Sequence, residues 1–422
     1  MPNEPIPAGD VRMRGFANRV LVEDAIAWID EYSQPGPAET VAIDESHGRV
    51  LAADVLAEID VPEFDRAAMD GYALRGAETN GASDYNPVTF RVVGESLPGR
   101  AFSGTITPGS AVRIMTGAPL PAMADAVLPV EYARQSVDGV EVTTTVAQLK
   151  HVGRRGEDVA RGAKLLSRGR RLRPQDVGLA ASVGLHQVSV RSRPRVRILT
   201  TGNEVVEPGG PKGEYEIFDA NSTMLLGLVL RDGAELESKV HVLDDRDAIR
   251  RAMLAPGADV ILVSGGSSVG AEDHAPSIVA VDGELAIHGI AMRPSSPAGM
   301  GSFNSSLVFL LPGNPVSCLC AYDFFAGRAI RRLGGRSVEF PYATQTAKLA
   351  RKLVSSVGRV DYCRVCVRGG RVEPLAISGA SILSSTSRAD GFVIVPAELE
   401  GYAPESEVTV YRYESAEQGT AD

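Results

Sequence analysis

Between residues 195 and 335, the pattern of apolar positions predicts short apolar strands that alternate with amphipathic helices. The strand candidates are Val196–Leu199, Val240–Leu243, Asp259–Val263 and Leu307–Leu311, and the helix candidates are Asn221–Leu230, Asp245–Leu254 and Val316–Leu333. Strands that alternate with helices at this spacing predict a parallel sheet covered on both faces. Asn221 and Asp245 are residue types that cap helix N-termini, and each stands at the start of a predicted helix.

The preceding residues follow two other patterns. Residues 20–29 have apolar side chains at helical spacing; we expect this helix to pack on its own chain, with another subunit as the alternative. From residue 46 to about 150, β-branched runs alternate with Gly and Pro turns, which predicts a small β-rich domain. Its strand candidates are Val88–Val93, Ala111–Met115, Ala126–Val130 and Val140–Val146. A further helix is expected over Pro174–Val183, ended by Gly184.

The last part of the chain changes character after Gly335. Short alternating strands between Gly and Pro turns continue to about Tyr413 and predict a small β-barrel or sandwich. The polar residues 414–422 are expected to be disordered. We therefore divide the chain into a linking segment (15–45 with 151–190), a β-rich insertion (46–150), an α/β domain (191–335) and a C-terminal β domain (336–413).

Composition narrows the choice of partners. The chain has 422 residues, of which 44% are hydrophobic and 23% charged, as in soluble globular proteins. Its net charge is -10 and the basic stretch 153–172 reads as a solvated face, so nucleic acid and anionic membranes are poor partners. Residues 1–14 lack the apolar run of a signal peptide, and no run reaches the roughly 18 residues of a membrane span, so we expect a cytoplasmic protein.

The cysteines do not form a disulfide framework, because only four occur in this length: Cys318, Cys320, Cys363 and Cys366. Cys363 and Cys366 have the CxxC spacing of zinc ligands, but they lie in an alternating strand-like run, where an offset of three residues sends them to opposite faces. We expect buried apolar thiols, with zinc as the less favoured alternative.

Chemistry-bearing residues follow the predicted strands of the 195–335 domain. These strand-end segments are Thr200–Glu204, Asp244–Asp245, Ser264–Gly270 and Pro312–Pro315. Ligands bind at the carboxyl ends of the strands in open parallel sheets, and parallel strands share that edge. The four segments therefore predict one crevice for a phosphorylated ligand.

The glycine loop and the carboxylates indicate what this crevice binds. Gly265 and Gly266 let the backbone approach a ligand, and a helix that follows them offers N–H groups to phosphate. The loop has neither the GxGxxG nor the GxxxxGK[ST] spacing, which argues against a nicotinamide oxidoreductase and a P-loop NTPase. Glu204, Asp244 and Asp273 would repel one another unless they share protons or bind a cation, and Mg²⁺ is the economical choice.

Several motifs together resemble those of the molybdopterin molybdenumtransferase family, which includes the gephyrin E domain. The motifs are Ala67–Ala73 (AAMDGYA), Ile114–Pro121 with Ala124–Val127, Arg155–Asp158, Thr201–Glu204, Gly265–Gly270, Leu311–Pro315, and Ser378–Ala380 with Asp390–Phe392. The similarity extends over about residues 15–413. It implies an elongated dimerising segment, a β-rich insertion, a three-layer α/β molybdopterin-binding domain and a C-terminal β-barrel.

The resemblance implies a homodimeric enzyme that inserts molybdenum from molybdate into adenylylated molybdopterin. The step depends on Mg²⁺, releases AMP and forms the molybdenum cofactor, in a cleft where the insertion of one subunit faces the α/β domain of the other. The implied partners are the pterin nucleotide, a second subunit and other proteins of the cofactor pathway.

Site residues follow from the matching motifs. The implied acidic site residues are Asp70, Asp158, Glu204, Asp244 and Asp273, of which Asp244 and Asp273 position Mg²⁺ and Asp70 and Glu204 hold or protonate molybdate oxygens. The implied substrate-binding residues are Thr201, Gly202, Gly265, Gly266, Ser267, Ser268, Gly270, Arg293, Pro312, Gly313 and Asn314. Arg154, Arg155 or Arg293 is expected to supply a cation near molybdate.

The chain departs from the family at Pro294–Pro297, where Pro-Ser-Ser-Pro replaces the usual Pro-Gly-Lys-Pro. The change removes a glycine suited to positive φ and a lysine charge. Ser267 replaces a residue that is usually apolar. The alternative function is therefore a catalytically impaired member that acts as a gephyrin-like scaffold or binding protein. The sequence leaves the choice between molybdate and tungstate open.

Overall fold

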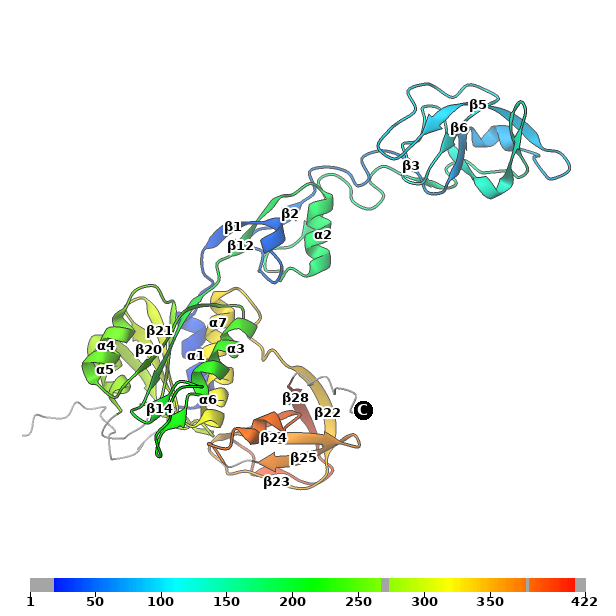
Figure 1. Cartoon of the computed structure of the whole chain (residues 1–422). Coiled ribbons are helices and arrows are strands. Elements are labelled where there is room, and N and C mark those ends of the chain that lie inside the picture. The colour runs from blue at the N-terminus through cyan, green and yellow to red at the C-terminus, as the bar shows by residue number, and fades with distance from the viewer. Residues whose placement is uncertain (1–18, 267–272, 377–378, 414–422) are drawn as a thin grey trace, which may run out of the picture. The chain divides into compact units, whose positions relative to one another are not determined.

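The computed structural model describes residues 19–266, 273–376 and 379–413 and divides into two units (Figure 1). One unit comprises Met1–Glu39 with Arg191–Asp422, and the other comprises Thr40–Val190. None of the helices in the described ranges is both long enough and apolar enough to cross a membrane.

A six-stranded sheet organises the α/β part of the first unit, in the order β16-β13-β17-β21-β20-β18. The strands are β13 (Arg195–Thr201), β16 (Glu235–Val242), β17 (Val260–Ser264), β18 (Glu284–His288), β20 (Gly299–Phe303) and β21 (Ser306–Leu311). The first four strands of that order run parallel, as the sequence predicted. The sheet extends beyond the four predicted strands, because β20 and β18, which the sequence did not predict, add an antiparallel edge. The sequence pattern did not predict β20, because glycines at 299 and 301 lower the strand propensity of this segment.

Helices cover both faces of this sheet (Figure 1). They are α1 (Val22–Tyr32), α3 (Asn221–Arg231), α4 (Arg246–Leu254), α5 (His274–Asp282), α6 (Pro315–Ala321), a π turn η4 (Tyr322–Ala326) and α7 (Gly327–Leu333). Alternate strand residues face opposite layers: Ile198 packs with α1, α3, α6 and α7, whereas Leu199 packs with α4 and α5. The expected three-layer arrangement follows, and α1 buries Ala25 and Ile29 on its own chain.

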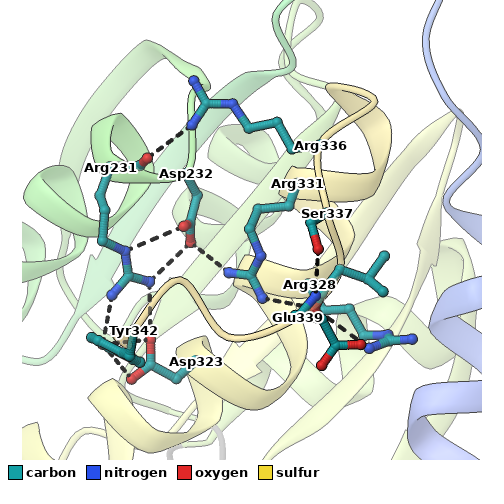
Figure 2. A network of polar contacts seen from close by, with 10 residues as sticks. Arg231, Asp232, Asp323, Arg328, Arg331, Arg336, Ser337, Glu339 and Tyr342 are labelled. Atoms are coloured by element: carbon teal, nitrogen blue, oxygen red, sulfur yellow. Dashed lines mark hydrogen bonds and ion pairs between the residues drawn. The ribbon is translucent and has the colours of Figure 1, made fainter. Parts of the chain in front are cut away.

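A buried polar network holds the end of α3 against the π turn and the segment that enters the C-terminal sheet (Figure 2). Arg231 donates to Asp232 and Asp323 at 3.0 Å each and to the Tyr342 hydroxyl at 2.5 Å. Arg331 donates to the same Asp232 carboxylate at 3.0 Å. Burial raises the pKa of Asp323, and the Arg231 guanidinium opposes that rise. These pairs offset part of the cost of burying the charges and connect α3 to the π turn and to the segment before β22.

The C-terminal part is β-rich, as expected. Its elements are β19 (Met292–Arg293), β22 (Ala343–Leu349), β23 (Leu353–Val354), β24 (Val360–Arg368), β25 (Arg371–Ala376), α8 (Ser384–Ser387), β26 (Gly391–Val395), β27 (Gly401–Tyr402) and β28 (Glu407–Arg412). The pairings run β24-β25-β22-β28-β26, and β26 also pairs with β24. Alternating valines of these strands form a separate apolar core.

All four cysteines are buried and free, as predicted for apolar thiols. Burial raises the pKa of Cys363 to about 12, which keeps the thiol protonated and unreactive. Among the described residues no group of three or more His, Cys, Asp or Glu side chains could hold a metal ion. The zinc alternative therefore receives no support.

The second unit contains the β-rich segment. Its elements, with the two strands β1 and β12 at its ends, are β1 (Ala38–Ala42), η1 (Ile43–Glu45), β2 (Val55–Leu56), β3 (Arg66–Ala67), β4 (Gly71–Leu74), η2 (Gly76–Thr79), β5 (Val88–Ser96), β6 (Ser110–Ile114), β7 (Ala126–Pro129), η3 (Val130–Tyr132), β8 (Ala133–Ser136), β9 (Gly139–Val142), β10 (Val152–Gly153), β11 (Lys164–Leu166), α2 (Pro174–Ser182) and β12 (Gln187–Arg191). A six-stranded sheet has the order β7-β4-β6-β5-β9-β8, so each β-branched run of the sequence contains a strand. Much of the basic stretch is exposed and paired, for example Arg155 with Asp60 and Lys164 with Asp54.

Candidate functional site

A cavity of about 660 Å³ opens at the carboxyl ends of β13, β17 and β21. The predicted site residues that line it are Thr201, Gly202, Glu204, Asp244, Gly265, Gly266, Asp273, Pro312, Gly313 and Asn314. They come from four strand-end segments that are far apart in the sequence. The structure therefore brings these segments together at one edge of the sheet.

The glycine loop lies directly against the end of β13. Gly265 and Gly266 have φ values of +93° and +55°, which residues with side chains adopt at a cost. A Cβ on Gly265 would lie 2.5 Å from the carbonyl oxygen of Thr201, and one on Gly266 would lie 2.9 Å from Thr201 Oγ1. Both the conformation and the close approach thus require glycine. The predicted ligands Ser267, Ser268 and Gly270 lie outside the described residues.

Three carboxylates follow strand ends or precede helices beside the cavity: Asp244, Asp245 and Asp273. Asp244 is held by Asn203 from the neighbouring strand end through hydrogen bonds in both directions. Asp273 is the N-cap residue of α5. Asp245 accepts the N–H of Ala248 at 2.6 Å and caps α4, as the sequence predicted. Of these two adjacent residues, Asp244 faces the cavity and Asp245 stabilises a helix.

The cap prediction for Asn221 is wrong. Asp219 Oδ1 accepts the N–H of Ser222 at 2.8 Å, so Asp219 satisfies the start of α3. Asn221 is the first helical residue, and its Nδ2 donates to Ser264 Oγ at 2.9 Å and to the Gly313 carbonyl at 2.8 Å. Its side chain therefore connects the start of α3 to the ends of two strands, β17 and β21, at the cavity wall.

Sequence reasoning missed several residues that line the cavity. They are Val205, Ile217, Phe218, Asp219, Ala220, Asn221, Pro297 and Ser381, whereas Thr200, Ser264 and Pro315 belong to the predicted strand-end segments. Ser381 comes from the C-terminal β-rich part and donates its hydroxyl to Asn314 Oδ1 at 2.7 Å. In the sequence, only the position of Ser381 directly after the Ser378–Ala380 motif indicated a role at the site. Ile217 and Phe218 form the short strand β15, which pairs with β14 (Val205–Val206).

The Pro294–Pro297 loop accommodates its unusual serines. Ser295 has a φ of +92° and is buried, and its hydroxyl donates to the Ser317 carbonyl at 2.6 Å. Arg19 donates from Nε to Ser296 Oγ at 2.7 Å. The buried hydrogen bond offsets part of the cost of the left-handed conformation.

Arg293, a predicted ligand, is absent from the residues that line the cavity. Its Nε donates to Asp361 Oδ1 at 2.9 Å, and its Nη2 forms a second hydrogen bond to the same carboxylate. Asp361 is fully buried and also accepts from the Ser355 hydroxyl at 2.6 Å. The guanidinium of Arg293 is thus engaged between the α/β and C-terminal parts of the first unit.

The remaining predicted residues lie in the second unit. Asp70 Oδ1 accepts the Thr116 N–H at 2.6 Å and the Thr116 hydroxyl at 2.7 Å. These two hydrogen bonds hold the pKa of Asp70 below its ordinary value. Asp158 donates its N–H to the Val61 carbonyl at 3.1 Å. Two motifs of the sequence therefore meet at Asp70, since Thr116 belongs to the 114–121 motif.

Comparisons with known proteins cover nearly the whole described chain. The family model described as MoeA N-terminal region (domain I and II) matches residues 20–184, that of a probable molybdopterin binding domain matches 197–332, and that of the MoeA C-terminal region (domain IV) matches 346–413. A molybdopterin molybdenumtransferase 2 of Mycobacterium tuberculosis is 34% identical over 88% of this chain and 94% of its own.

Two further relatives give the same picture. A molybdopterin molybdenumtransferase of Staphylococcus aureus is 28% identical over 94% of this chain and 96% of its own. The crystal structure of a molybdopterin biosynthesis moeA protein from Pyrococcus horikoshii OT3 has a TM-score of 0.78 and 30% identity. The match covers 94% of this chain and all of that structure.

Proposed function

This chain belongs to the molybdopterin molybdenumtransferase family, and we propose that it inserts molybdenum from molybdate into adenylylated molybdopterin, releasing AMP and forming the molybdenum cofactor. The observation that carries the proposal is the single cavity at the strand ends. It combines a glycine loop with the carboxylates Glu204, Asp244 and Asp273. A phosphorylated pterin and a cation are the ligands that suit this combination.

The pyrophosphate of the substrate is assigned to the glycine loop and to the start of α5. Gly265 and Gly266 let this loop lie directly against Thr201, where a Cβ would collide, and so place the loop backbone at the cavity. Helix α5 begins at His274 beside the cavity, and the positive end of a helix dipole attracts phosphate. The role assigned to these residues is to bind and orient the pyrophosphate, which is cleaved when AMP is released. They form no covalent bond to the substrate themselves.

Mg²⁺ fits the carboxylates of the cavity. Asp244 and Asp273 both line it and come from different strand ends. Protein sites commonly hold Mg²⁺ with one or two carboxylates, water and substrate phosphate, so a larger cluster of acidic residues is not required. Mg²⁺, when bound, neutralises charge on the pyrophosphate. The protein contributes a carboxylate in a fixed position, because Asn203 and Asp244 are joined by two hydrogen bonds.

Asp70 and Glu204 are assigned to the oxygens that leave molybdate. The Thr116 hydrogen bonds favour ionised Asp70, which suits a carboxylate that accepts hydrogen bonds rather than one that delivers a proton. Glu204, which lines the cavity, is proposed to hold or protonate a departing oxygen.

The active form is proposed to be a homodimer in which Asp70 and Asp158 act with the cavity of a second copy. Mixing an Asp70→Asn protein with an Asp244→Asn protein tests this idea. Activity that returns on mixing supports action across subunits, and two inactive parents that stay inactive as a verified mixed dimer contradict it. The cytoplasmic location, and contacts with other proteins of the cofactor pathway, stay predictions.

The decisive experiment supplies purified chain with adenylylated molybdopterin, molybdate and Mg²⁺ and measures AMP release and cofactor formation. Activity is expected with molybdate, and a parallel arm with tungstate defines the choice of oxyanion. Failure to release AMP in a protein that binds the substrate contradicts the proposal. Such a result would favour the scaffold alternative, which no observation on the described residues supports.

A further inference from the structure

Two large apolar side chains are exposed on the wall of the cavity, which is also lined by carboxylates. Ile217 and Phe218 line the cavity and are 56% and 45% exposed. Their backbone is fixed on both sides, because Ile217 donates its N–H to the Glu204 carbonyl at 2.7 Å and Asp219 donates its N–H to the Val206 carbonyl at 2.8 Å. An apolar surface that is open to solvent in a binding cavity is one that a ligand can cover and remove from water.

A buried acceptor lies in the wall of the same cavity. Asn221 is only 8% exposed, and both of its Nδ2 protons are donated, one to Ser264 Oγ and one to the Gly313 carbonyl. The Gly313 carbonyl can only accept, so the amide cannot be flipped. Asn221 Oδ1 is buried and has no hydrogen-bond partner among the residues that the structure describes. A buried acceptor without a donor is costly, and a ligand donor removes that cost.

We propose that Ile217, Phe218 and Asn221 form a subsite for a planar nitrogen heterocycle. The ring lies with its face on Phe218 and Ile217 and donates an N–H from its edge to Asn221 Oδ1. Aromatic and aliphatic side chains pack well against ring faces, and the fixed amide selects a donor on the edge.

This inference rests on the proposed function and identifies the residues that recognise the substrate. Adenylylated molybdopterin carries two rings of this kind, adenine and pterin, and both have N–H donors. The chemistry of the subsite is shared by the two rings, so the choice between them belongs to the experiment.

Calorimetric titration of the full chain tests the subsite with four probes. The probes are AMP, purine riboside 5′-monophosphate (which lacks the adenine amino group), 6-hydroxymethylpterin and ribose 5-phosphate (which has no ring base). Phe218→Ala and Asn221→Leu are each expected to weaken binding of the recognised ring about tenfold, while ribose 5-phosphate binds as before. Loss of AMP affinity together with weak binding of purine riboside monophosphate identifies adenine, and loss of pterin affinity identifies pterin.

Two control variants separate recognition from general damage. Phe218→Trp keeps a flat face and is expected to retain ring binding. Tyr215→Ala removes an aromatic ring that is 86% exposed, near the same strand but outside the cavity lining, and is expected to change no affinity. Phe218 is exposed, so its replacement tests the subsite even if Asn221→Leu does not fold.

The experiment distinguishes a failure of this inference from a failure of the proposed function. If the wild-type chain binds neither AMP nor pterin, both this inference and the proposed function fall. If it binds them and the Phe218 and folded Asn221 variants bind them equally well, only this inference is overturned. Equal loss of ring ligands and ribose 5-phosphate in both variants also overturns it, because the residues then shape the cavity without selecting a ring.

Discussion

Asn203 and Asp244 hold each other at the ends of two neighbouring strands. The N–H of Asn203 donates to Asp244 Oδ2 at 3.0 Å, and the N–H of Asp244 donates to Asn203 Oδ1 at 3.1 Å. The two residues are far apart in the sequence, but β13 and β16 are adjacent in the sheet. This reciprocal pair fixes a cavity carboxylate without using a helix cap or a buried cation.

Replacing Asn203 by Ala is expected to lower the rate of AMP release by no more than about threefold, with a small effect on stability. The variant loses the bond from the Asp244 N–H to Asn203 Oδ1, but it keeps the main-chain N–H of residue 203 that holds the Asp244 carboxylate. The side chain is exposed, so the lost bond contributes about 1 kcal/mol or less to folding. Single-turnover AMP release and thermal unfolding measure the two effects. A loss of tenfold or more would show that the side chain of Asn203, and not its main chain, positions Asp244.

Asp244→Asn is expected to raise the Mg²⁺ concentration for half-maximal activity by tenfold or more, because a neutral amide is a poor ligand for Mg²⁺. A Mg²⁺ titration of AMP release measures the shift. Asp245→Ala is the matched control, since Asp245 caps α4 through Ala248. The control should lose about 1 kcal/mol of stability and keep its Mg²⁺ dependence. Equal shifts in both variants would contradict the assignment.

Ser295→Ala is expected to destabilise the protein by about 2 kcal/mol, whereas Ser295→Gly is expected to be nearly neutral. Alanine keeps the cost of the left-handed backbone and leaves the buried Ser317 carbonyl without its donor. Glycine loses the same hydrogen bond but removes the backbone cost. Calorimetric unfolding of the three proteins tests this order. Equal loss in both variants would show that the backbone is not strained.

The Pro294–Pro297 loop also permits a test of the lost lysine. The double variant Ser295→Gly with Ser296→Lys restores the family pattern and removes the acceptor of Arg19. If the loop limits catalysis, AMP release should increase. Because the wild-type loop is well bonded, we expect less than a twofold change, and a larger gain would revive the impaired-enzyme alternative.

Acid should weaken the second unit partly through Asp176. Hydrogen bonds from Arg173 and Arg170 hold the pKa of Asp176 well below its ordinary value. A carboxyl with a lowered folded-state pKa stabilises the fold above its unfolded pKa and loses this contribution as the pH falls. The wild type should exceed Asp176→Asn by about 1 kcal/mol near neutral pH, since both arginines are partly exposed. Calorimetry should show this gap closing below about pH 4, and a constant gap would contradict the linkage.

Much of the cavity could be predicted because the carboxyl ends of parallel strands share one edge. The strand ends at Thr201, Asp244, Gly265 and Gly313 needed only the apolar pattern and the rule for ligand placement in such sheets. The antiparallel edge formed by β18 and β20 was missed, because strand order depends on pairing between segments and glycines hide the period.

The local pattern could not decide the role of single side chains. Asn221 looked like a helix cap, but Asp219 takes that role and Asn221 bonds to Ser264 and Gly313. Arg293 looked like a ligand for an anion, but the buried Asp361 pairs with it. In each case the competing partner comes from another segment of the chain.

The sequence by itself determined the family, the α/β core and the set of strand-end residues, because each rests on local periods and contiguous motifs. Only the tertiary structure decided that Asn203 and Asp244 form hydrogen bonds with each other. It also decided that Asn221, which lines the cavity, has a buried Oδ1 with no partner among the described residues. The reason is physical: hydrogen-bond partners are chosen by distance and direction after the chain has folded, and neither quantity is written in the spacing of residues.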